Sequence, residues 1–115
     1  MVEGSQIDWA AHDNDKKQIV KEMLDFDETI GKVLDFAQRD GNTLVIITAD
    51  HETGGMTILN GKFGSDDMDA YFSTKNHSGV PVPIYAFGPG AEQFTGIMEN
   101  TAFKGKIEKL LDFKK

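Results

Sequence analysis

Three histidines are the only ones in this 115-residue chain, and their surroundings suggest chemistry. His12 follows Asp8 by four positions, His51 comes directly after Asp50, and His77 lies in the segment Asn-His-Ser-Gly. Imidazole nitrogens and carboxylate oxygens are donor atoms that hold zinc and related divalent cations. A lone histidine is more often a packed or surface residue than a ligand. Three histidines, two of them beside aspartates, instead predict a metal site.

Length, charge and composition limit the classes of protein to which such a site can belong. A chain of 115 residues suits one small domain or a piece of a larger one. It has no cysteine, so disulfides and thiolate metal sites are excluded. The formal net charge of -7 argues against nucleic-acid binding as the main role, because phosphate neutralisation needs clustered lysine and arginine. No apolar run approaches the ~20 residues of a membrane span, and the first residues do not form a secretory signal.

A long amphipathic helix is predicted between residues 13–15 and Gly41. Several N-cap residues, Asp-Asn-Asp, stand at its start, and Asp40-Gly41 is a natural end. Apolar residues recur at steps of four and three, which predicts a helix with one buried face. These residues are Ile19, Met23, Phe26, Ile30, Val33 and Ala37, and Phe36 extends the predicted core. Arg39 in the last turn is expected to be a surface charge near the negative end of the helix dipole.

The rest of the chain shows further strand and helix patterns. Residues 43–48 form a continuous apolar, largely β-branched run, which is typical of a strand buried on both faces of a parallel sheet. Residues 56–63 resemble a hairpin with a type I′ turn at Asn60-Gly61. Residues 82–87 predict another strand, closed by Gly-Pro-Gly at 88–90. Pro83 favours an edge position or a strand start there.

Two shorter helices complete the prediction. Asp66 or Asp67 is expected to cap a short helix that runs through Tyr71 and Phe72. Asn100 or Thr101 is expected to cap a final helix that carries an apolar stripe. The stripe consists of Phe103, Ile107, Leu110 and Leu111.

These elements predict an α/β fold with a partial doubly wound, mostly parallel sheet flanked by helices. Residues 1–4 have the form of the last residues of a buried strand, although a strand needs about five residues. With that stub the sheet has only three strands of this kind, and parallel sheets need both faces covered. We therefore expect a piece of a larger α/β enzyme.

The motifs resemble a known family. Residues 2–8 (Val-Glu-Gly-Ser-Gln-Ile-Asp) with His12, residues 48–55 (Thr-Ala-Asp-His-Glu-Thr-Gly-Gly) and residues 76–79 (Asn-His-Ser-Gly) resemble the C-terminal part of alkaline phosphatases in order and spacing. The resemblance covers essentially the whole chain. Cofactor-independent phosphoglycerate mutases and sulfatases share an Asp-His pair after a strand, but not the first string. The resemblance implies that residues 1–115 are a single C-terminal fragment of an alkaline-phosphatase-like domain.

Two zinc ions and one magnesium ion are the cofactors that the resemblance implies. The ligands it implies are Asp8, His12 and His77 for the first zinc, Asp50 and His51 for the second zinc, and Glu3 for magnesium. One turn of a helix would place Asp8 and His12 on one face. Adjacent side chains diverge in an extended segment, so Asp50 and His51 need a tight loop, which Gly54 and Gly55 permit.

The catalytic nucleophile of the family is absent from this chain. The family uses a serine in an Asp-Ser motif, an upstream aspartate and a phosphate-binding arginine, and none of the serines here stands in that motif. Ser78 beside His77 is better explained as a turn hydroxyl than as a nucleophile. We therefore expect a phosphate monoester hydrolase of which this chain is the zinc-binding part, about one zinc bound here, and no activity in the isolated chain. The substrate or product would be a phosphate monoester or inorganic phosphate.

Two other functions were weighed against the phosphatase interpretation. His51-Glu52 begins like a zincin motif, but Gly55 replaces the second histidine, so a metalloprotease is excluded. The alternative function is a non-catalytic acidic α/β module that binds a single divalent cation.

Trp9 is expected to pack at the rim of the site. An uncovered sheet edge would favour self-association. By resemblance the parent enzyme would be periplasmic or secreted and a homodimer, with neither a membrane nor a nucleic acid as partner.

Overall fold

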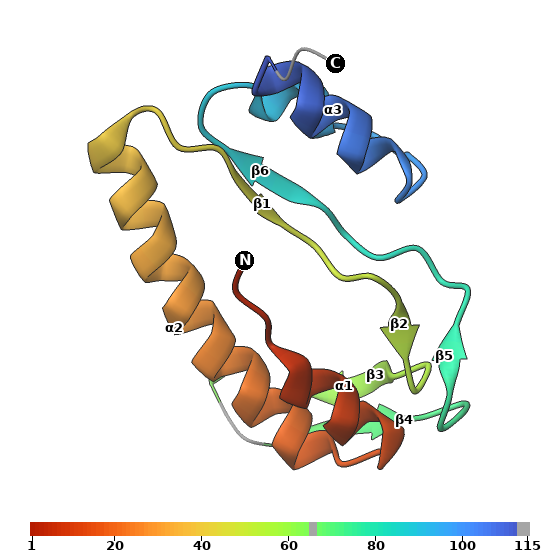
Figure 1. The fold of residues 1–115 in the computed structure, drawn as a ribbon. Coiled ribbons are helices and arrows are strands. Elements are labelled where there is room, and N and C mark those ends of the chain that lie inside the picture. The colour runs from red at the N-terminus through yellow and green to blue at the C-terminus, as the bar shows by residue number, and fades with distance from the viewer. Residues whose placement is uncertain (65–66, 113–115) are drawn as a thin grey trace. The chain divides into compact units, whose positions relative to one another are not determined.

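The chain divides into two compact units in the computed structural model, which describes residues 1–64 and 67–112 (Figure 1). The first unit comprises Met1–Gly31 and His51–Val82, and the second comprises Lys32–Asp50 and Pro83–Lys115. The prediction of a single domain stays a prediction. None of the described helices is both long enough and apolar enough to cross a membrane.

Two consecutive helices open the chain, and the second of them continues from the first unit into the second. Helix α1 spans Ser5–His12 and helix α2 spans Lys16–Asp40, as predicted from its apolar spacing. The Gln18 backbone N–H donates to Asp15 Oδ1 at 3.1 Å, which confirms the predicted N-cap. At the other end Gly41 takes a left-handed φ of +69°, the conformation expected of a residue that ends a helix. Local chemistry therefore sets both ends of α2.

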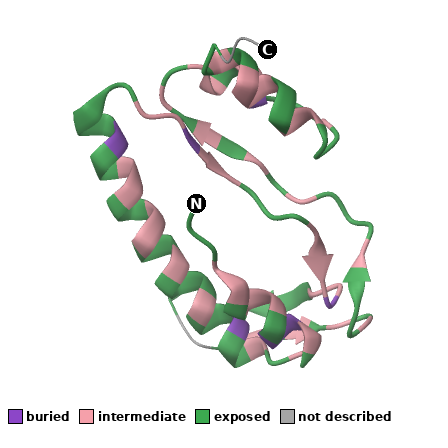
Figure 2. Ribbon diagram, viewed as in Figure 1, coloured by how far each residue is buried: buried purple, intermediate pink, exposed green. Residues whose placement is uncertain are grey.

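A small apolar cluster packs α1 and α2 against residues beside β3 and β4. Figure 2 colours the ribbon by burial and shows few buried residues. Ala10, Ala11 and Ile19 are buried, and the half-buried Met56 and Phe72 pack against them. Along α2 only Ile19 and Ala37 are buried, while Phe36 is 55 % exposed. The predicted core stripe of α2 is therefore covered only in part by the described residues.

Two antiparallel strand pairs complete the first unit. Strand β2, Glu52–Thr53, pairs with β5, His77–Ser78. Strand β3, Thr57–Gly61, pairs with β4, Met68–Tyr71.

The β3–β4 pair corrects two predictions. The type I′ turn at Asn60-Gly61 is wrong, because these residues pair with Asp69 and Met68 and the connection comes later in the chain. The short helix through Tyr71 and Phe72 is also wrong. Burial alternates along β4, with Met68 and Ala70 half-buried, which is a strand period of two. Of its two proposed caps, Asp66 lies outside the described residues.

One antiparallel ribbon lies at the centre of the second unit. Strand β1, Val45–Ile47, pairs with β6, Tyr85–Phe87, so both predicted strands are confirmed in shortened form. The parallel arrangement is wrong for this pair, since Val45 faces Phe87 and Ile47 faces Tyr85. All three sheets in the described residues are two-stranded and antiparallel. A β-branched run predicts burial, but it carries no information on the direction of the neighbouring strand.

After β6 the chain turns sharply at Gly88 and continues into two helices. Gly88 has a φ of +99°, and a Cβ there would collide with the carbonyl oxygen of Thr43, so only glycine fits. A 3₁₀ helix, η1, follows at Ala91–Phe94, and α3 spans Ala102–Leu110 as predicted. Thr101 takes the predicted N-cap position of α3, but its side chain makes no capping hydrogen bond.

The first four residues form no regular element. The predicted strand end at residues 1–4 is wrong, because no strand among residues 1–64 and 67–112 pairs with them. A strand persists only where a neighbour satisfies its backbone N–H and C=O groups. The coarse class is nevertheless the predicted one, since helices and strands are mixed along the chain.

Candidate metal centre

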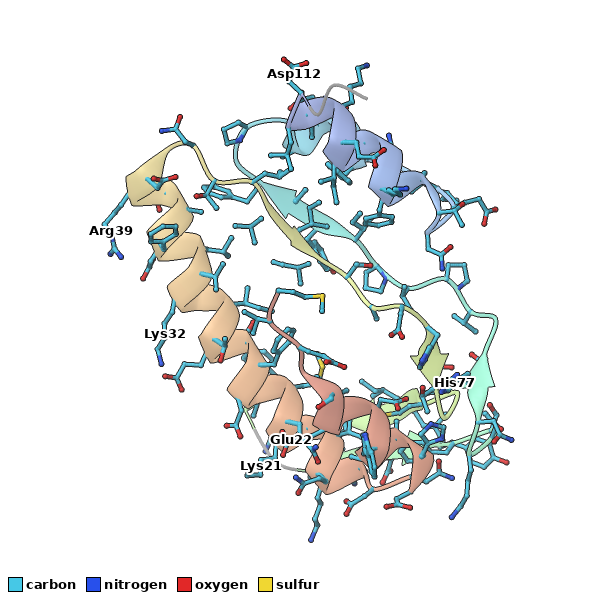
Figure 3. The ribbon with its side chains drawn as sticks, in the orientation of Figure 1. Lys21, Glu22, Lys32, Arg39, His77 and Asp112 are labelled. Carbon is cyan, nitrogen blue, oxygen red and sulfur yellow. The ribbon has the colours of Figure 1, made fainter. Side chains whose placement is uncertain are left out.

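Three predicted ligands converge in the first unit. Asp8 and His12 stand one turn apart on α1, with His12 Nε2 3.5 Å from Asp8 Oδ2. His77 lies on β5 (Figure 3). Its Nε2 lies 3.2 Å from His12 Nε2 and 3.8 Å from Asp8 Oδ1. One donor atom from each of the three residues lies within 4.8 Å of the others.

The spacing of these atoms suits a tetrahedral cation. Zinc with bonds of about 2.0–2.1 Å separates its ligand atoms by about 3.3–3.4 Å. The two imidazole nitrogens, 3.2 Å apart, are close to that value, while the histidines face different oxygens of Asp8, His12 at 3.5 Å from Oδ2 and His77 at 3.8 Å from Oδ1. All three side chains are partly exposed, so a fourth position is open to water or an anion. Two imidazole nitrogens and one carboxylate are also the kind of donor set that zinc accepts.

A backbone carbonyl sets the tautomer of His12. His12 Nδ1 lies 2.6 Å from the carbonyl oxygen of Lys75. Because a carbonyl only accepts, Nδ1 must carry the proton, and the neutral ring presents the lone pair of Nε2 to Asp8 and His77. Such a contact on the far nitrogen is the usual support of a metal-binding histidine.

His51 lies directly beside this cluster. Its ring stacks on that of His77, with ring centroids 3.5 Å apart and an angle of 19° between the planes. Pairing of β2 with β5 places Thr53 opposite His77. The Thr53 hydroxyl lies 2.6 Å from Asp8 Oδ1 and 3.1 Å from His51 Nδ1. A ligand predicted for the second zinc is therefore linked to one predicted for the first.

Glu52 fixes the loop that follows the Asp-His pair. Its Oε1 accepts the backbone N–H of Gly55 at 2.8 Å, and its other oxygen accepts the hydroxyl of Ser78. Gly54 and Gly55 both have positive φ, +88° and +58°, so the chain turns tightly there, while the predicted convergence of Asp50 and His51 on one ion stays a prediction. The hydroxyl of Ser78 is directed at a carboxylate, which fits a structural role better than that of a nucleophile.

Glu3, Asp50 and His51 are not members of this group of three. Glu3 is exposed and precedes α1, and Asp50 is exposed and ends the segment of the second unit that leads to His51. Within the described part of the chain, Asp8, His12 and His77 form the only group of three such residues with metal-ligand spacing. The structure thus brings together half of the six predicted ligands, with His51 adjacent.

Sequence reasoning misjudged two residues near the site. Trp9 is 69 % exposed, so its predicted packing at the rim is wrong for this chain. Thr53 was not singled out, although it stands two residues after His51, the spacing that keeps side chains on one side of an extended segment. Arg39 is exposed in the last turn of α2, as expected.

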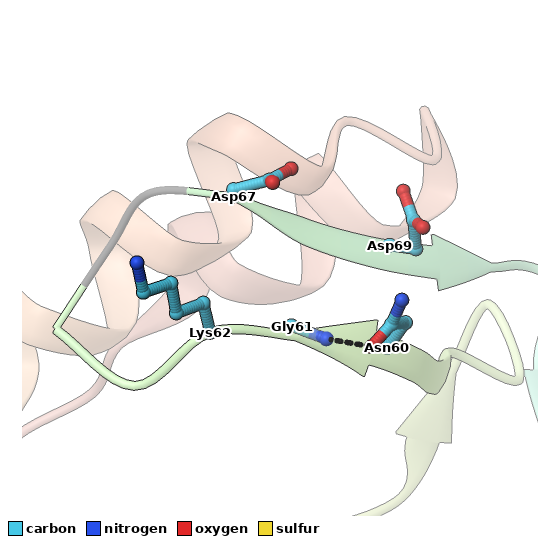
Figure 4. Close-up of a pocket in the computed structure, with 5 residues that line it drawn as sticks. All are labelled: Asn60, Gly61, Lys62, Asp67 and Asp69. Carbon is cyan, nitrogen blue, oxygen red and sulfur yellow. Dashed lines mark hydrogen bonds between the residues drawn. The ribbon is translucent and has the colours of Figure 1, made fainter.

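A hollow lies on the β3–β4 hairpin, apart from the residues of the α1–β5 cluster (Figure 4). It is lined by Asn60, Gly61, Lys62, Asp67 and Asp69. A lysine shares it with two aspartates, and the Asn60 side chain accepts the N–H of Gly61 at 2.9 Å. The hollow contains no histidine, so it offers less to zinc than the α1–β5 cluster.

Comparison with known proteins agrees with the motifs. The alkaline phosphatase family model matches residues 1–71. Alkaline phosphatase 4 of Bacillus subtilis (strain 168) is 32 % identical over 96 % of this chain, which covers 39 % of that relative. Streptomycin-6-phosphate phosphatase of Streptomyces griseus is 34 % identical over 96 % of the chain, which covers 28 % of it. The chain therefore spans two fifths or less of the length of these relatives.

Solved structures show the same relationship in three dimensions. Alkaline phosphatase from the Antarctic bacterium TAB5 matches 97 % of this chain with a TM-score of 0.89 and 46 % identity, over 34 % of its own length. A variant of the TAB5 enzyme with Mg bound in the M3 site matches with a TM-score of 0.88, 44 % identity and coverage of 97 % and 35 %.

Proposed function

The chain belongs to the alkaline phosphatase family, and we propose that it is the C-terminal, metal-binding part of a longer enzyme that hydrolyses phosphate monoesters. The convergence of Asp8, His12 and His77 supports this proposal, because the three residues have metal-ligand spacing. By resemblance they would be the ligands of the first zinc of the family. Asp50 and His51 would bind the second zinc and Glu3 would bind magnesium. The rest of the enzyme would supply the nucleophilic serine and any parallel strands of a doubly wound sheet, since the three described strand pairs are antiparallel.

Each described residue of the cluster has a definable task. Asp8 contributes the negative charge that balances the cation, and the Lys75 carbonyl orients His12 so that Nε2 faces inward. His77 closes the third side from β5. A zinc ion held by these residues would supply Lewis acidity and would lower the pKa of a bound water towards about 7.

Zinc titration of the purified chain tests the assignment. We expect about one tightly bound zinc per chain, lost in His12→Ala and in His77→Ala. Asp69→Asn is the matched control, because it removes a carboxylate of the same unit that lies in the hairpin hollow. Unchanged stoichiometry in both histidine variants would exclude these residues as ligands.

The isolated chain should have no more than trace phosphatase activity and form no phosphoenzyme. None of its serines stands in the nucleophile motif, and loss of transition-state charge stabilisation commonly costs orders of magnitude in rate. A chromogenic phosphate ester at alkaline pH with zinc and magnesium provides the assay. Robust turnover that disappears in Ser78→Ala would overturn this expectation.

Some properties of the whole enzyme follow from the same proposal. It would act outside the cytoplasm, in the periplasm or as a secreted protein, and would form a homodimer. The alternative is a non-catalytic module that binds one cation. The coding sequence discriminates the two, since an enzyme requires an Asp-Ser motif upstream of this chain.

A further inference from the structure

The side chain of Asn14 joins the end of α1 to the segment that leads into β5. Its amide lies 2.9 Å from the carbonyl oxygen of Thr74 and 3.0 Å from that of Ala11. A carbonyl oxygen only accepts hydrogen bonds, so the amide atom that faces both carbonyls is the nitrogen, which has two protons to donate. Asn14 therefore links the last turn of α1 to residue 74 through its side chain.

The backbone of Asn14 has a conformation that few residue types adopt. Its φ is +57°, in the left-handed region, and the residue is half-buried directly after α1. Asparagine tolerates this region better than most other residues that have a side chain. A substitution that is meant to test the amide must therefore also tolerate a positive φ.

Residues 74–76 are also bound to the loop after β2. The carbonyl of Gly54 accepts the backbone N–H of Thr74 at 3.2 Å, and the N–H of Gly54 donates to the carbonyl of Asn76 at 3.1 Å. Within the segment, the Thr74 hydroxyl accepts the N–H of Asn76 at 3.0 Å. These bonds hold the segment to β2, and the amide of Asn14 adds a link to α1.

The same segment determines where one predicted zinc ligand lies. His77 follows it directly, 65 positions after His12, and the two Nε2 atoms are 3.2 Å apart. The other two predicted ligands of this group belong to α1, so their distance from His77 depends on what holds the segment to that helix. Zinc accepts bond lengths only within about 0.2 Å of their usual values. A shift of the segment away from α1 would therefore weaken zinc binding.

We propose that Asn14 is a positioning residue, which sets the distance from His77 to Asp8 and His12 by tying residues 74–76 to the end of α1. The inference rests on the proposed function for the zinc ion, but the distance itself is a property of the metal-free chain. Asn14 acts through the backbone of this segment rather than by binding the cation.

Two substitutions of Asn14 remove its donor in different ways. Asn14→Gly removes the amide and permits the left-handed φ. Asn14→Asp keeps the shape but has no N–H group, and its carboxylate oxygen would face two carbonyl oxygens that repel it. Asn42→Asp is the matched control, because the Asn42 amide also donates to a backbone carbonyl, that of Asp40 at 3.2 Å, and lies in the second unit.

The first measurement is the distance between the rings of His12 and His77 in the metal-free chain. The ring centroids are 5.0 Å apart, close enough for nuclear Overhauser cross-peaks between their ring protons. We expect these cross-peaks in the parent chain and in Asn42→Asp, and their loss or clear weakening in both Asn14 variants. Circular dichroism identifies the variants that are folded.

The second measurement is the zinc dissociation constant, with zinc alone as the probe. Loss of a residue that supports metal ligands typically weakens binding by about 10–100-fold. We expect about a tenfold loss in Asn14→Gly and at least as large a loss in Asn14→Asp, the lower end of that range, because Asn14 acts through the backbone. Asn42→Asp should keep the parental affinity.

Several results would overturn the inference. A folded Asn14→Gly variant that keeps the parental cross-peaks would do so, as would one that keeps the zinc affinity of a parent chain that binds zinc. An equal loss of affinity in Asn42→Asp would attribute the effect to stability rather than to position. Asn14→Asp decides in the same way should Asn14→Gly fail to fold, and unfolding of both variants would assign Asn14 to stability alone.

The two measurements also separate this inference from the zinc proposal. A parent chain that binds no zinc, but whose cross-peaks disappear in the folded Asn14 variants, would refute the zinc proposal and support the role of Asn14.

Discussion

Different kinds of contact stabilise the two units, each within itself. In the first unit, the site joins α1 to strands of only two residues, and side-chain hydrogen bonds from Glu52 and Thr53 supply the links. In the second unit, Phe94 is 2 % exposed and packs against Phe103, with ring centroids 5.8 Å apart. Hydrogen bonds depend on direction and apolar packing depends on volume. Substitutions in the two units should therefore separate metal binding from stability.

The largest expected effect is on the stability of the second unit. Phe94→Ala removes its most buried aromatic ring, and such a change typically lowers the free energy of unfolding by about 3–5 kcal/mol. The zinc dissociation constant should not change, because the described contacts of Asp8, His12 and His77 all lie in the first unit. Hydrogen exchange of the two units, followed by zinc titration, measures both quantities.

Phe63→Ala provides the control for Phe94→Ala. Phe63 is fully exposed, so its truncation should leave the free energy of unfolding unchanged. Loss of zinc binding in Phe94→Ala, with the first unit still protected from exchange, would contradict the separation between the units.

A smaller effect is expected at Glu52, which makes two of the side-chain hydrogen bonds of the first unit. Glu52→Ala leaves the N–H of Gly55 and the hydroxyl of Ser78 without their carboxylate, and a lost partner of this type costs about 1–3 kcal/mol. Zinc binding should also weaken, because the hydrogen bond between Glu52 and Ser78 connects β2 to β5, the strand that contains His77. Thermal unfolding with and without zinc measures both effects.

Glu52→Gln sharpens the same prediction. Its amide oxygen can still accept from Gly55 and its amide group can donate to Ser78, so most of the stability and affinity should return. Equal losses in Glu52→Ala and Glu52→Gln would show that charge, rather than the two hydrogen bonds, is what matters at this position.

Predictions from the sequence succeeded where the cause is local. Asp15 and Gly41 mark the two ends of α2, because each satisfies backbone groups of its own helix. The four-residue spacing of Asp8 and His12 likewise follows from one turn of α1. The approach of His77, 65 residues after His12, followed only from family resemblance, because spacing along a chain says nothing about such distant neighbours.

Predictions failed where a distant partner decides the structure. Asn60-Gly61 has the sequence of a tight turn, yet pairing with Asp69 and Met68 keeps both residues in a strand. The direction of β1 depends on β6, some forty positions later, which no feature of β1 encodes. Thr53 was missed for the same reason, since its partner Asp8 lies 45 positions earlier.

The smallest expected effect concerns an exposed ion pair on α2. Lys21 Nζ lies 2.9 Å from Asp25 Oδ2, and the hydrogen bond and charge of Asp25 raise the pKa of Lys21 above its usual 10.5. A raised lysine pKa means that the pair stabilises the folded chain below pH 10.5 and that this contribution is lost as the pH rises through the folded-state pKa. Both side chains are well exposed, so solvent screens the pair and the gain is small.

Lys21→Gln should therefore leave zinc binding unchanged and lower the melting temperature only slightly, and this difference should vanish at high pH or high salt. Lys104→Gln, which loses a longer pair with Glu108 at 3.7 Å, should do even less. A melting temperature that falls clearly in Lys21→Gln and stays low in high salt would show that α2 depends on this pair in a way that its exposure does not explain.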